Sequence, residues 1–394
     1  MSILCVNAGS SSIKVAVYRP DAAEALVTGA VEGIGESESH LWLRDAHGAI
    51  LRDETRSSPS HDEAIDLVLE AVDRIEHAPA VAAVGHRVVH GGRRFVEPTL
   101  IDGAVLQELG GLVHLAPLHM PSAIAAIAAV ATRSPSIPQV ACFDTAFHRR
   151  LPEIAQRLPL PEWAWQEGIC RFGFHGLVYE HVTEILGPRC GRVVIAHLGS
   201  GASMAAIHDG LPIDTTMAFT PTAGLMMGTR TGDLDPGIIV HLLRDHGMDA
   251  DDIEHLVNSE SGLQGVSGST ADMHSLLEAR ALDARADRAI TMFCRSARKA
   301  IGALAATLGG IDQLVFTGGI GENAPVVRAE ICAGLEHLGV VIDPERNTCN
   351  DDVVSAPDAP CGVRTVTASE DVVIARHTAA LIGSRRGGGR DPGD

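Results

Sequence analysis

Several short segments of the sequence place glycine beside side chains that bind or transfer anionic groups. Residues 3–14, ILCVNAGSSSIK, set three serines and Lys14 directly after an apolar run. Hydroxyls and backbone N–H groups clustered at a tight turn suit an anion such as phosphate, although this is not the G-x-x-x-x-G-K-[ST] loop. Taken alone, the stretch fits a polar hairpin turn equally well.

Arginine, histidine and aspartate recur in similar segments further along the chain. Arg87 lies in HRVVHGG, Asp144 in CFDTAFH, His175 in RFGFHG and Arg230 in MMGTRTGDLDP. A guanidinium group can bind phosphoryl or carboxylate oxygens through two parallel hydrogen bonds. Asp144 follows the apolar run VACF, so we expect it at the end of a strand and facing a cleft, with a helix cap as the alternative. These segments favour an enzyme that binds nucleotide phosphates and directs arginines at a second anion.

Length and composition limit the class of protein. A chain of 394 residues with 45% hydrophobic and 21% charged residues predicts two domains, each with its own core. The net charge of -19 argues against non-specific binding to nucleic acid or an anionic membrane. We expect no secretory signal and no membrane span. The eight cysteines are scattered without zinc-type spacing, which indicates reduced thiols in the cytoplasm.

The elements that must position these residues form two similar units. Short apolar runs over residues 3–45 predict an antiparallel meander, and apolar residues recur at helical spacing over 61–78. A second strand, Gly/Ser turn and strand begins at Val193, which favours a duplicated domain with one phosphate loop per half; the alternative is the chance recurrence of a common turn. Residues 284–308 predict a long helix that leads into a strand, a glycine turn and a helix, an order that suits a nucleotide. Residues 386–394 are typical of a disordered tail.

The motifs together resemble those of the acetate kinase family, within the superfamily that includes actin, Hsp70 and the sugar kinases. They run through nearly the whole chain: NAGSSSIK (7–14), GHRVVHGG (85–92), APLHMP (116–121), FDTAFH (143–148), FGFHG (172–176), HLGSGAS (197–203), DTTMAFTP (214–221), GLMMGTRTGDLDP (224–236) and FTGGIGENA (316–324). The resemblance implies an α/β fold of two duplicated ribonuclease H-like domains, of the actin/Hsp70 type, with a cleft between them. It implies an N-terminal domain of residues 1–147 with a C-terminal helix at about 371–385, and a C-terminal nucleotide-binding domain of residues 148–370.

The same resemblance implies an activity. This is the reversible, ATP-dependent phosphorylation of acetate, or of another short-chain carboxylate, by in-line phosphoryl transfer, with Mg2+ or alternatively Mn2+ as the metal. It also implies a cytoplasmic homodimer that binds ATP and ADP and has neither nucleic acid nor a membrane as a partner. A propionate or butyrate kinase of the same family is one alternative, and a nucleotide-binding module of the actin or Hsp70 type is another.

Position by position, the resemblance implies four groups of site residues. The catalytic group is Arg87, Asp144, His175 and Arg230. The nucleotide-binding group is Ser10, Ser12, Lys14, His197, Leu198, Gly199, Ser200, Gly201, Asp272, Met273, His274, Gly319, Ile320, Gly321, Glu322 and Asn323. The substrate pocket is Val89, Leu118, Phe174 and Pro221, and the metal-associated pair is Asn7 and Glu370.

Four positions depart from the family pattern. Met120 stands where asparagine is usual, and Tyr179 where a second histidine is usual. Ser200 replaces asparagine and His274 replaces arginine in the nucleotide segments, so these two bear on nucleotide preference. The reaction type still fits, because a carboxylate is already ionised near pH 7 and needs charge stabilisation more than a strong base. Asp144 then organises metal-bound water or positions the substrate.

Overall fold

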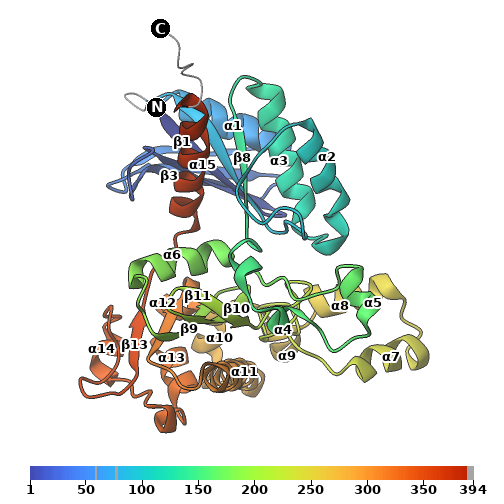
Figure 1. Ribbon diagram of the computed structural model, residues 1–394, viewed down its shortest axis with the longest axis vertical. Coiled ribbons are helices and arrows are strands. Elements are labelled where there is room, and N and C mark those ends of the chain that lie inside the picture. Colours follow the sequence, from blue (N-terminus) through green and yellow to red (C-terminus); the bar gives the residue numbers. More distant parts are fainter. Residues whose placement is uncertain (58–59, 76–78, 388–394) are drawn as a thin grey trace. The chain divides into compact units, whose positions relative to one another are not determined.

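The computed structural model describes residues 1–57, 60–75 and 79–387. Its internal contacts divide the chain into two compact units: Met1–Phe147 together with Ser369–Asp394, and His148–Ala368. Each unit is a sheet covered by helices (Figure 1). Glu370 belongs to the first unit, although the sequence boundary placed it in the second, because the helix that it begins packs on strands of the first unit.

The first unit is built on an eight-stranded sheet. Its strands are β1 (Ser2–Ala8), β2 (Ser12–Tyr18), β3 (Ala25–Glu32), β4 (Ser39–Asp45), β5 (Ile50–Arg56), β6 (Val81–Val88), β7 (Thr99–Leu100) and β8 (Gln139–Phe143), in the order β5-β4-β3-β2-β1-β6-β8-β7. The predicted meander is confirmed, since β1 to β5 pair antiparallel in sequence order. The next strands, β6 and β8, continue parallel to β1, which brings the carboxyl ends of all three to one edge of the sheet.

Helices cover both faces of this sheet. They are α1 (His61–Asp73), α2 (Gly103–Gly111), α3 (Met120–Arg133) and α15 (Glu370–Gly387), with the short 3-10 helix η1 (Val113–Leu115). Leu4 and Val6 of β1 belong to the core that α1 and α3 complete, whereas Cys5 points the other way and donates to the Asp371 carbonyl of α15 at 3.3 Å. This alternation is the period-two pattern of a strand buried on both faces. The tail predicted from residue 386 was wrong for residues 386 and 387, which continue α15, and residues 388–394 lie outside the described residues.

The second unit repeats the plan with five strands. They are β9 (Arg192–Leu198), β10 (Ala202–His208), β11 (Leu211–Thr215), β12 (Gln313–Thr317) and β13 (Gly362–Thr365), in the order β11-β10-β9-β12-β13. Three antiparallel strands are followed by two parallel ones, as in the β3-β2-β1-β6-β8 part of the first sheet. The prediction of a duplicated domain is therefore confirmed.

The helices of the second unit surround this sheet. They are α4 (Glu153–Gln156), α5 (Glu162–Gln166), α6 (Gly176–Leu186), α7 (Pro236–Asp245), α8 (Ala250–Ser259), α9 (Gly262–Ser267), α10 (Met273–Ala279), α11 (Ala284–Leu308), α12 (Gly318–Asn323), α13 (Pro325–Cys332) and α14 (Pro344–Thr348), with the 3-10 helices η2 (Phe147–Arg150), which begins at the unit boundary, and η3 (Glu336–Leu338). The long helix α11 has the predicted bounds and buries Ile290, Phe293, Ala297 and Ile301 on one face.

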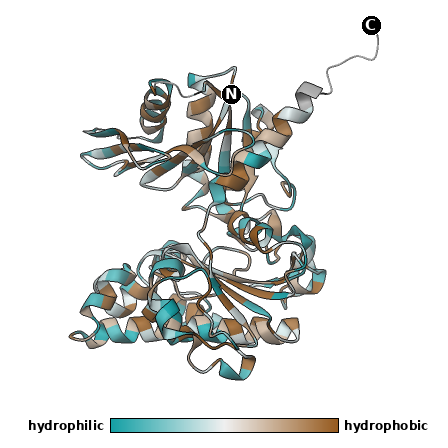
Figure 2. Cartoon of the chain, turned by 90° about the vertical axis from the view of Figure 1, so that its left-hand side faces the viewer, coloured by the Kyte–Doolittle hydropathy of each residue, from teal (hydrophilic) through white to brown (hydrophobic). Residues whose placement is uncertain are grey.

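Two of these helices enclose the sheet. Helices α6 and α11 both contact β9 and lie on opposite faces of it (Figure 1). The strands between them carry much of the hydrophobic colouring of this unit (Figure 2). Among the described residues, no helix combines the length and the apolar character that crossing a membrane requires.

Candidate functional site

A half-buried arginine joins two carboxylates at the carboxyl ends of the parallel strands of the first unit. Arg87, on β6, donates from Nη2 to Asp144 Oδ2 at 2.6 Å, and from Nη1 to Glu370 Oε1 at 3.0 Å. Asn7 Nδ2 donates to the same Glu370 oxygen at 2.5 Å. The topology explains the meeting, because β1 and β8 flank β6 and α15 begins beside them. Asp144 lies at a strand end as predicted, but its carboxylate is bound to Arg87 and does not cap a helix.

The charges of this cluster do not balance. Burial alone would lower the pKa of Arg87, but Asp144 and Glu370 outweigh it and hold that pKa above its ordinary value. Burial, Asp144 and Asp371 together raise the pKa of Glu370 to about 7, against the opposing effects of Arg87 and Lys14. Three acidic side chains thus face two cations, Arg87 and Lys14. The excess of negative charge suits a further cation.

The oxygen atoms in the cluster suit Mg2+. This ion prefers oxygen ligands and is usually held by one or two carboxylates together with water and substrate phosphates. The amide of Asn7 and the carboxylate of Glu370 lie within one hydrogen bond of each other and supply such oxygens. Across the described ranges, no group of three or more His, Cys, Asp or Glu side chains could hold a metal ion by itself. A magnesium ion here would therefore depend on water and phosphate oxygens for its remaining ligands.

The predicted phosphate residues of the first unit lie on the hairpin of β1 and β2. Gly9 N donates to Ser12 O at 2.7 Å and closes the turn, and Asn7 pairs with Lys14 across the two strands. Ser10 and Lys14 are exposed, so a ligand can reach both. The geometry is that of a polar hairpin turn, which was the alternative interpretation, and it leaves the phosphate role untested.

Two residues of the predicted substrate pocket also belong to the first unit. Val89 is half-buried and packs against a core cluster that contains Met120, itself fully buried at the start of α3. Leu118 is 45% exposed, and that cluster does not include it. Met120 is therefore a core residue that supports the segment carrying Val89, which explains why an apolar side chain is tolerated at this position.

Two predicted nucleotide segments meet at the carboxyl ends of β9 and β12. The parallel register pairs His197 with Thr317. Gly318 follows with φ of 81°, and a Cβ there would lie 2.7 Å from Leu198 O. Only a glycine allows this left-handed conformation and this close approach. The structure thus places the beginning of α12 directly against segment 197–201, and the nucleotide role of both segments stays a prediction.

The third nucleotide segment begins beside the first. Ser200 O accepts a hydrogen bond from Gly228 N at 3.0 Å, and a Cβ on Gly228 would lie 3.4 Å from Ala271 Cβ. Ala271 directly precedes Asp272. Ser200 therefore acts here through its backbone carbonyl, a contact that does not depend on the identity of its side chain.

The side chains of the third segment serve different purposes. Asp272 accepts from Ser275 N at 2.8 Å and caps α10, and these hydrogen bonds lower the pKa of Asp272. Met273 is only 4% exposed and belongs to the core. His274 is exposed and lies 3.7 Å from Glu278. Of the three, His274 presents the side chain that is best placed to meet a ligand.

Helix α12 contains the segment Gly319–Asn323, and its polar side chains mostly bind its own backbone. Glu322 Oε1 accepts from Gly318 N at 2.7 Å and from Ala368 N at 2.9 Å. Asn323 Nδ2 donates to Gly319 O at 3.0 Å. These contacts make Glu322 an organiser of the segment, and they leave Gly319 and Ile320 at its amino end to face a ligand.

Arg328 is a residue of this site that the sequence reasoning missed. Its guanidinium is fully buried and donates to Gly321 O at 2.9 Å and Glu322 O at 2.8 Å, two carbonyls in the C-terminal half of α12. It also donates to Asn347 Oδ1 at 2.8 Å and to Asn350 Oδ1 at 2.7 Å. The sequence signal that could have found it is an arginine within the largely apolar helical run PVVRAEIC. A charged side chain on the buried face of such a helix needs hydrogen-bond partners inside the protein.

His175 is held by a short chain of hydroxyl groups. It precedes α6 with φ of 59°, and its Nδ1 lies 2.8 Å from Ser203 Oγ. Tyr179, fully buried one turn further along α6, bonds the same Ser203 hydroxyl. Burial raises the pKa of Tyr179, so its phenol keeps its proton. The tyrosine that departs from the family pattern is therefore part of the support for His175.

Arg230 meets His175 at the turn between β9 and β10. A Cβ on Gly201 would lie 3.6 Å from both Arg230 Nη1 and His175 Nε2. Arg230 Nη1 donates to Pro221 O at 3.2 Å, and the His175 and His197 rings are 4.5 Å apart. The second unit thus brings together two predicted catalytic residues and two nucleotide segments.

The apolar residues of the second unit lie on neighbouring loops. Phe174 is 1% exposed and Pro221 is buried. The backbone N–H groups of Phe172 and Gly173 both donate to Ala218 O, at 2.9 and 3.3 Å, which ties the two loops together. Phe174 and Pro221 are therefore held close to the segment that carries His175 and Arg230.

Comparison with known proteins identifies the family. A family model described as the acetokinase family matches residues 2–376 of the chain. The chain belongs to the acetokinase family. An acetate kinase of Rhodopseudomonas palustris is 42% identical over 397 residues, covering 98% of this chain and 99% of that protein. An acetate kinase of Streptomyces avermitilis is 40% identical over 395 residues, covering 97% and 98%.

Solved structures of the acetokinase family share the fold. The acetate kinase of Porphyromonas gingivalis has a TM-score of 0.86 at 36% identity, over 97% of this chain and 99% of that one. A propionate kinase from Francisella tularensis has a TM-score of 0.90 at 34% identity, over 96% and 99%. Together with the repeated sheets, these matches confirm the predicted α/β fold of the two-domain actin/Hsp70 type.

Proposed function

We propose that the protein catalyses the reversible phosphorylation of acetate by ATP to give acetyl phosphate. The observation that carries the proposal is the convergence of His175, Arg230 and the segments 197–201 and 319–323 within one unit. This arrangement occurs in a chain that belongs to the acetokinase family over residues 2–376. The family relation favours phosphoryl transfer over a nucleotide-binding module without catalysis.

The main difficulty of this reaction is electrostatic. An acetate ion must approach the γ-phosphate of ATP, and both are negatively charged near pH 7. Arg87 and Arg230 would each stabilise charge on the equatorial oxygens of the transferring phosphoryl group. Because acetate carries no proton to remove, Asp144 need not act as a base. Its hydrogen bonds to Arg87 hold that guanidinium in place and keep it protonated.

The role of His175 follows from its hydrogen bonds. Ser203 has one hydroxyl proton, so if Tyr179 is the donor to Ser203, that proton is left for His175 Nδ1. The imidazole then carries its own proton on Nε2, the nitrogen that lies beside Gly201 on the side of Arg230. A neutral N–H donor at this point would bind a phosphoryl oxygen without repelling Arg230.

The remaining roles follow the grouping of residues in each unit. Asn7 and Glu370 would hold Mg2+, with Mn2+ as an alternative, and this ion would neutralise phosphate charge. Ser10, Ser12 and Lys14 would bind phosphate, and the segments His197–Gly201, Asp272–His274 and Gly319–Asn323 would bind the nucleotide. The methyl group of acetate would be received by Val89, Leu118, Phe174 and Pro221.

The test is acyl hydroxamate formation with ATP, Mg2+ and hydroxylamine, scanned over formate, acetate, propionate and butyrate. We expect acetate to be the best substrate and Arg230→Ala to lower the rate by about 10²-fold or more while nucleotide binding persists. Arg244→Ala is the matched control, since Arg244 is exposed on α7. A folded protein that gives no product with any acid would disprove the proposal. A preference for propionate or butyrate would instead make the protein a propionate or butyrate kinase of the same family.

We also propose that the protein is a cytoplasmic homodimer. All eight cysteines are free thiols, which fits a reducing compartment. The dimer rests on the family resemblance alone. Light scattering coupled to size-exclusion chromatography tests it, and a mass near the 41.4 kDa of one chain would refute it.

A further inference from the structure

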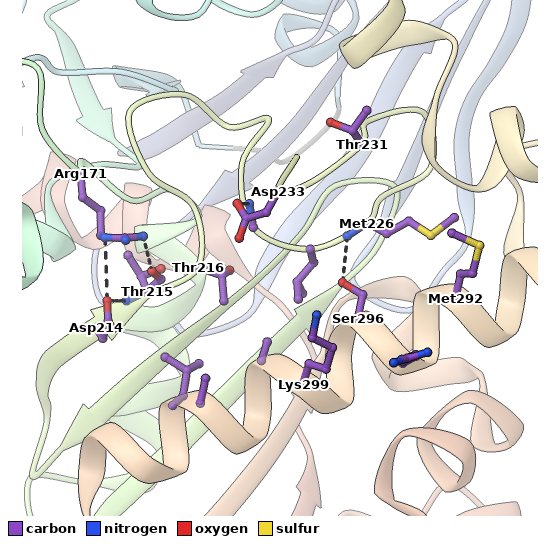
Figure 3. Close-up of a pocket in the computed structure, with 16 residues that line it drawn as sticks. Arg171, Asp214, Thr215, Thr216, Met226, Thr231, Asp233, Met292, Ser296 and Lys299 are labelled. Carbon is purple, nitrogen blue, oxygen red and sulfur yellow. Dashed lines mark hydrogen bonds and ion pairs between the residues drawn. The ribbon is translucent and has the colours of Figure 1, made fainter. Parts of the chain in front are cut away.

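The second unit contains a pocket that none of the proposed catalytic or binding residues lines. It has a volume of about 550 Å³ and lies between the C-terminal half of α11 and the loop that follows β11 (Figure 3). We refer to it as the α11 pocket, after the helix that supplies Arg295, Ser296 and Lys299. Its volume is within the range of small-molecule sites, about 300–1,000 Å³.

Two cations of the α11 pocket have no acidic partner. Arg295 and Lys299 are exposed and stand four residues apart on α11, so their head groups share one face of the helix. Neither head group makes a hydrogen bond or an ion pair with any other residue in the described part of the chain. Figure 3 shows Lys299 rising from the helix toward the loop that carries Asp233.

The two acidic side chains of the pocket contact groups other than Arg295 and Lys299. Asp214 lies 3.9 Å from Arg171 Nε, and Asp233 Oδ1 accepts from Gly224 N at 2.8 Å. Three cations and two carboxylates line the pocket, which gives a lining charge of +1 in a chain whose net charge is -19. A local excess of positive charge in so acidic a protein favours an anionic ligand.

The rest of the lining is largely apolar. Leu225, Met226, Met292 and Leu304 form this part of the wall. The two free cations can each bind one end of a ligand with two anionic groups, and the apolar wall favours a hydrocarbon chain between them. We propose that the α11 pocket binds a small organic dianion, a dicarboxylate of about five carbons.

The pocket lies at the base of the loop that carries Arg230. Gly224 and Asp233 both line the pocket and close the loop, because Asp233 N donates to Gly224 O at 2.9 Å in addition to the bond to its carboxylate. Ser296 Oγ, on α11, accepts from Met226 N at 3.2 Å and ties the loop to the helix. An occupant of the pocket would therefore restrain the loop and change the rate of the kinase. This second step rests on the proposed function, whereas the binding step does not.

The binding step is tested by titrating glutarate into the full-length protein in a calorimeter, without ATP or acetate. Glutaramide, its uncharged analogue, and inorganic phosphate, a single anionic group, are the comparison ligands. We expect glutarate to bind at least tenfold more tightly than either. The double variant Arg295→Gln/Lys299→Gln should weaken glutarate binding at least tenfold, and Arg288→Gln, exposed on α11 outside the pocket, should leave it unchanged.

The outcomes separate the two steps. Absence of glutarate binding, equal binding of glutaramide or phosphate, or unchanged binding by the double variant would each overturn the dianion site. Both substituted side chains are exposed, so circular dichroism of the double variant should match the wild type. If glutarate binds as expected, its effect on the acetate-dependent rate is measured next. A protein that binds glutarate but makes no acyl phosphate with any acid would fail the proposed function and keep the site.

Discussion

Replacing Arg328 by leucine should destabilise the protein and weaken its binding of nucleotide. The guanidinium is fully buried, and all of its partners are neutral oxygens. Two of these are the carbonyls of Gly321 and Glu322 in the C-terminal half of α12, and two more belong to Asn347. Leucine fills part of the same volume but donates no hydrogen bond.

The size of the effect follows from the groups that lose their donor. Three backbone carbonyls, those of Gly321, Glu322 and Asn347, would remain inside the protein without Arg328. Each buried polar group left without a partner costs about 1–3 kcal/mol. Removing the buried charge offsets part of this cost, because burial disfavours the charged guanidinium and lowers the pKa of Arg328. We therefore expect a loss of about 3–5 kcal/mol in the free energy of unfolding, a large part of the roughly 5–15 kcal/mol of a typical domain.

Urea unfolding followed by circular dichroism measures the stability, and calorimetry with a non-hydrolysable ATP analogue measures nucleotide binding. Arg328→Lys keeps the charge and three donors, so it should lose only about 1–3 kcal/mol. Arg244→Leu, at an exposed position, is the control for the loss of an arginine. An Arg328→Leu protein within about 1 kcal/mol of the wild type would refute the energetic argument. Lower stability with unchanged nucleotide affinity would refute the idea that Arg328 positions α12.

Three further predictions concern individual contacts. Tyr179→Phe removes the hydroxyl that bonds Ser203, so we expect kcat to fall about fivefold, the equivalent of one hydrogen bond, with little change in the KM for acetate. Gly318→Ala would force a Cβ to within 2.7 Å of Leu198 O, so the KM for ATP should rise at least tenfold, whereas Gly319→Ala, with open space at the Cβ position, should be milder. Burial lowers the pKa of His86 to about 4 from 6.5, so the unfolded chain binds more protons between these values and stability falls as the pH drops through them. Urea unfolding at pH 7 and pH 5 should show a drop that is about 2 kcal/mol smaller in His86→Asn than in the wild type, and an identical drop in both proteins would contradict the assigned pKa.

The spacing of apolar residues and the positions of turn residues predicted the helices and hairpins whose formation depends on residues close together in the sequence. The helix Ala284–Leu308 has the predicted bounds because its apolar residues keep helical spacing for seven turns and Gly309, with φ of 69°, ends it. The meander and the repeated strand units were equally visible, since alternating apolar residues and turn residues specify hairpins. The helix predicted from residue 61 is α1, and Ser60 caps it.

The contacts inside the site depend on which distant segments pack against each other, and a single sequence does not show this. Arg87 and Glu370 are 283 positions apart, and their ion pair exists because α15 returns to the strands of the first unit. No pattern of neighbouring residues predicts that α15 packs on the strands of the first unit. The same holds for Arg328, whose partners lie in two separate segments, Gly321–Glu322 and Asn347–Asn350. Family resemblance supplied Arg87 and Glu370 as candidates but not Arg328, and it did not say which atoms meet.

The two units share one arrangement of strands, but they place different groups at the carboxyl ends of those strands. The first unit buries formal charges at its strand ends, where Arg87 is held by Asp144 and Glu370. The second unit uses glycine, so that the backbone at Gly318 approaches Leu198 O closely. A cluster with excess carboxylate attracts a cation, and exposed backbone at glycine turns suits phosphate oxygens. Under the proposed function, one copy of the fold would supply the metal site and the other a nucleotide site, because the strand ends are equivalent while the residues placed on them are not.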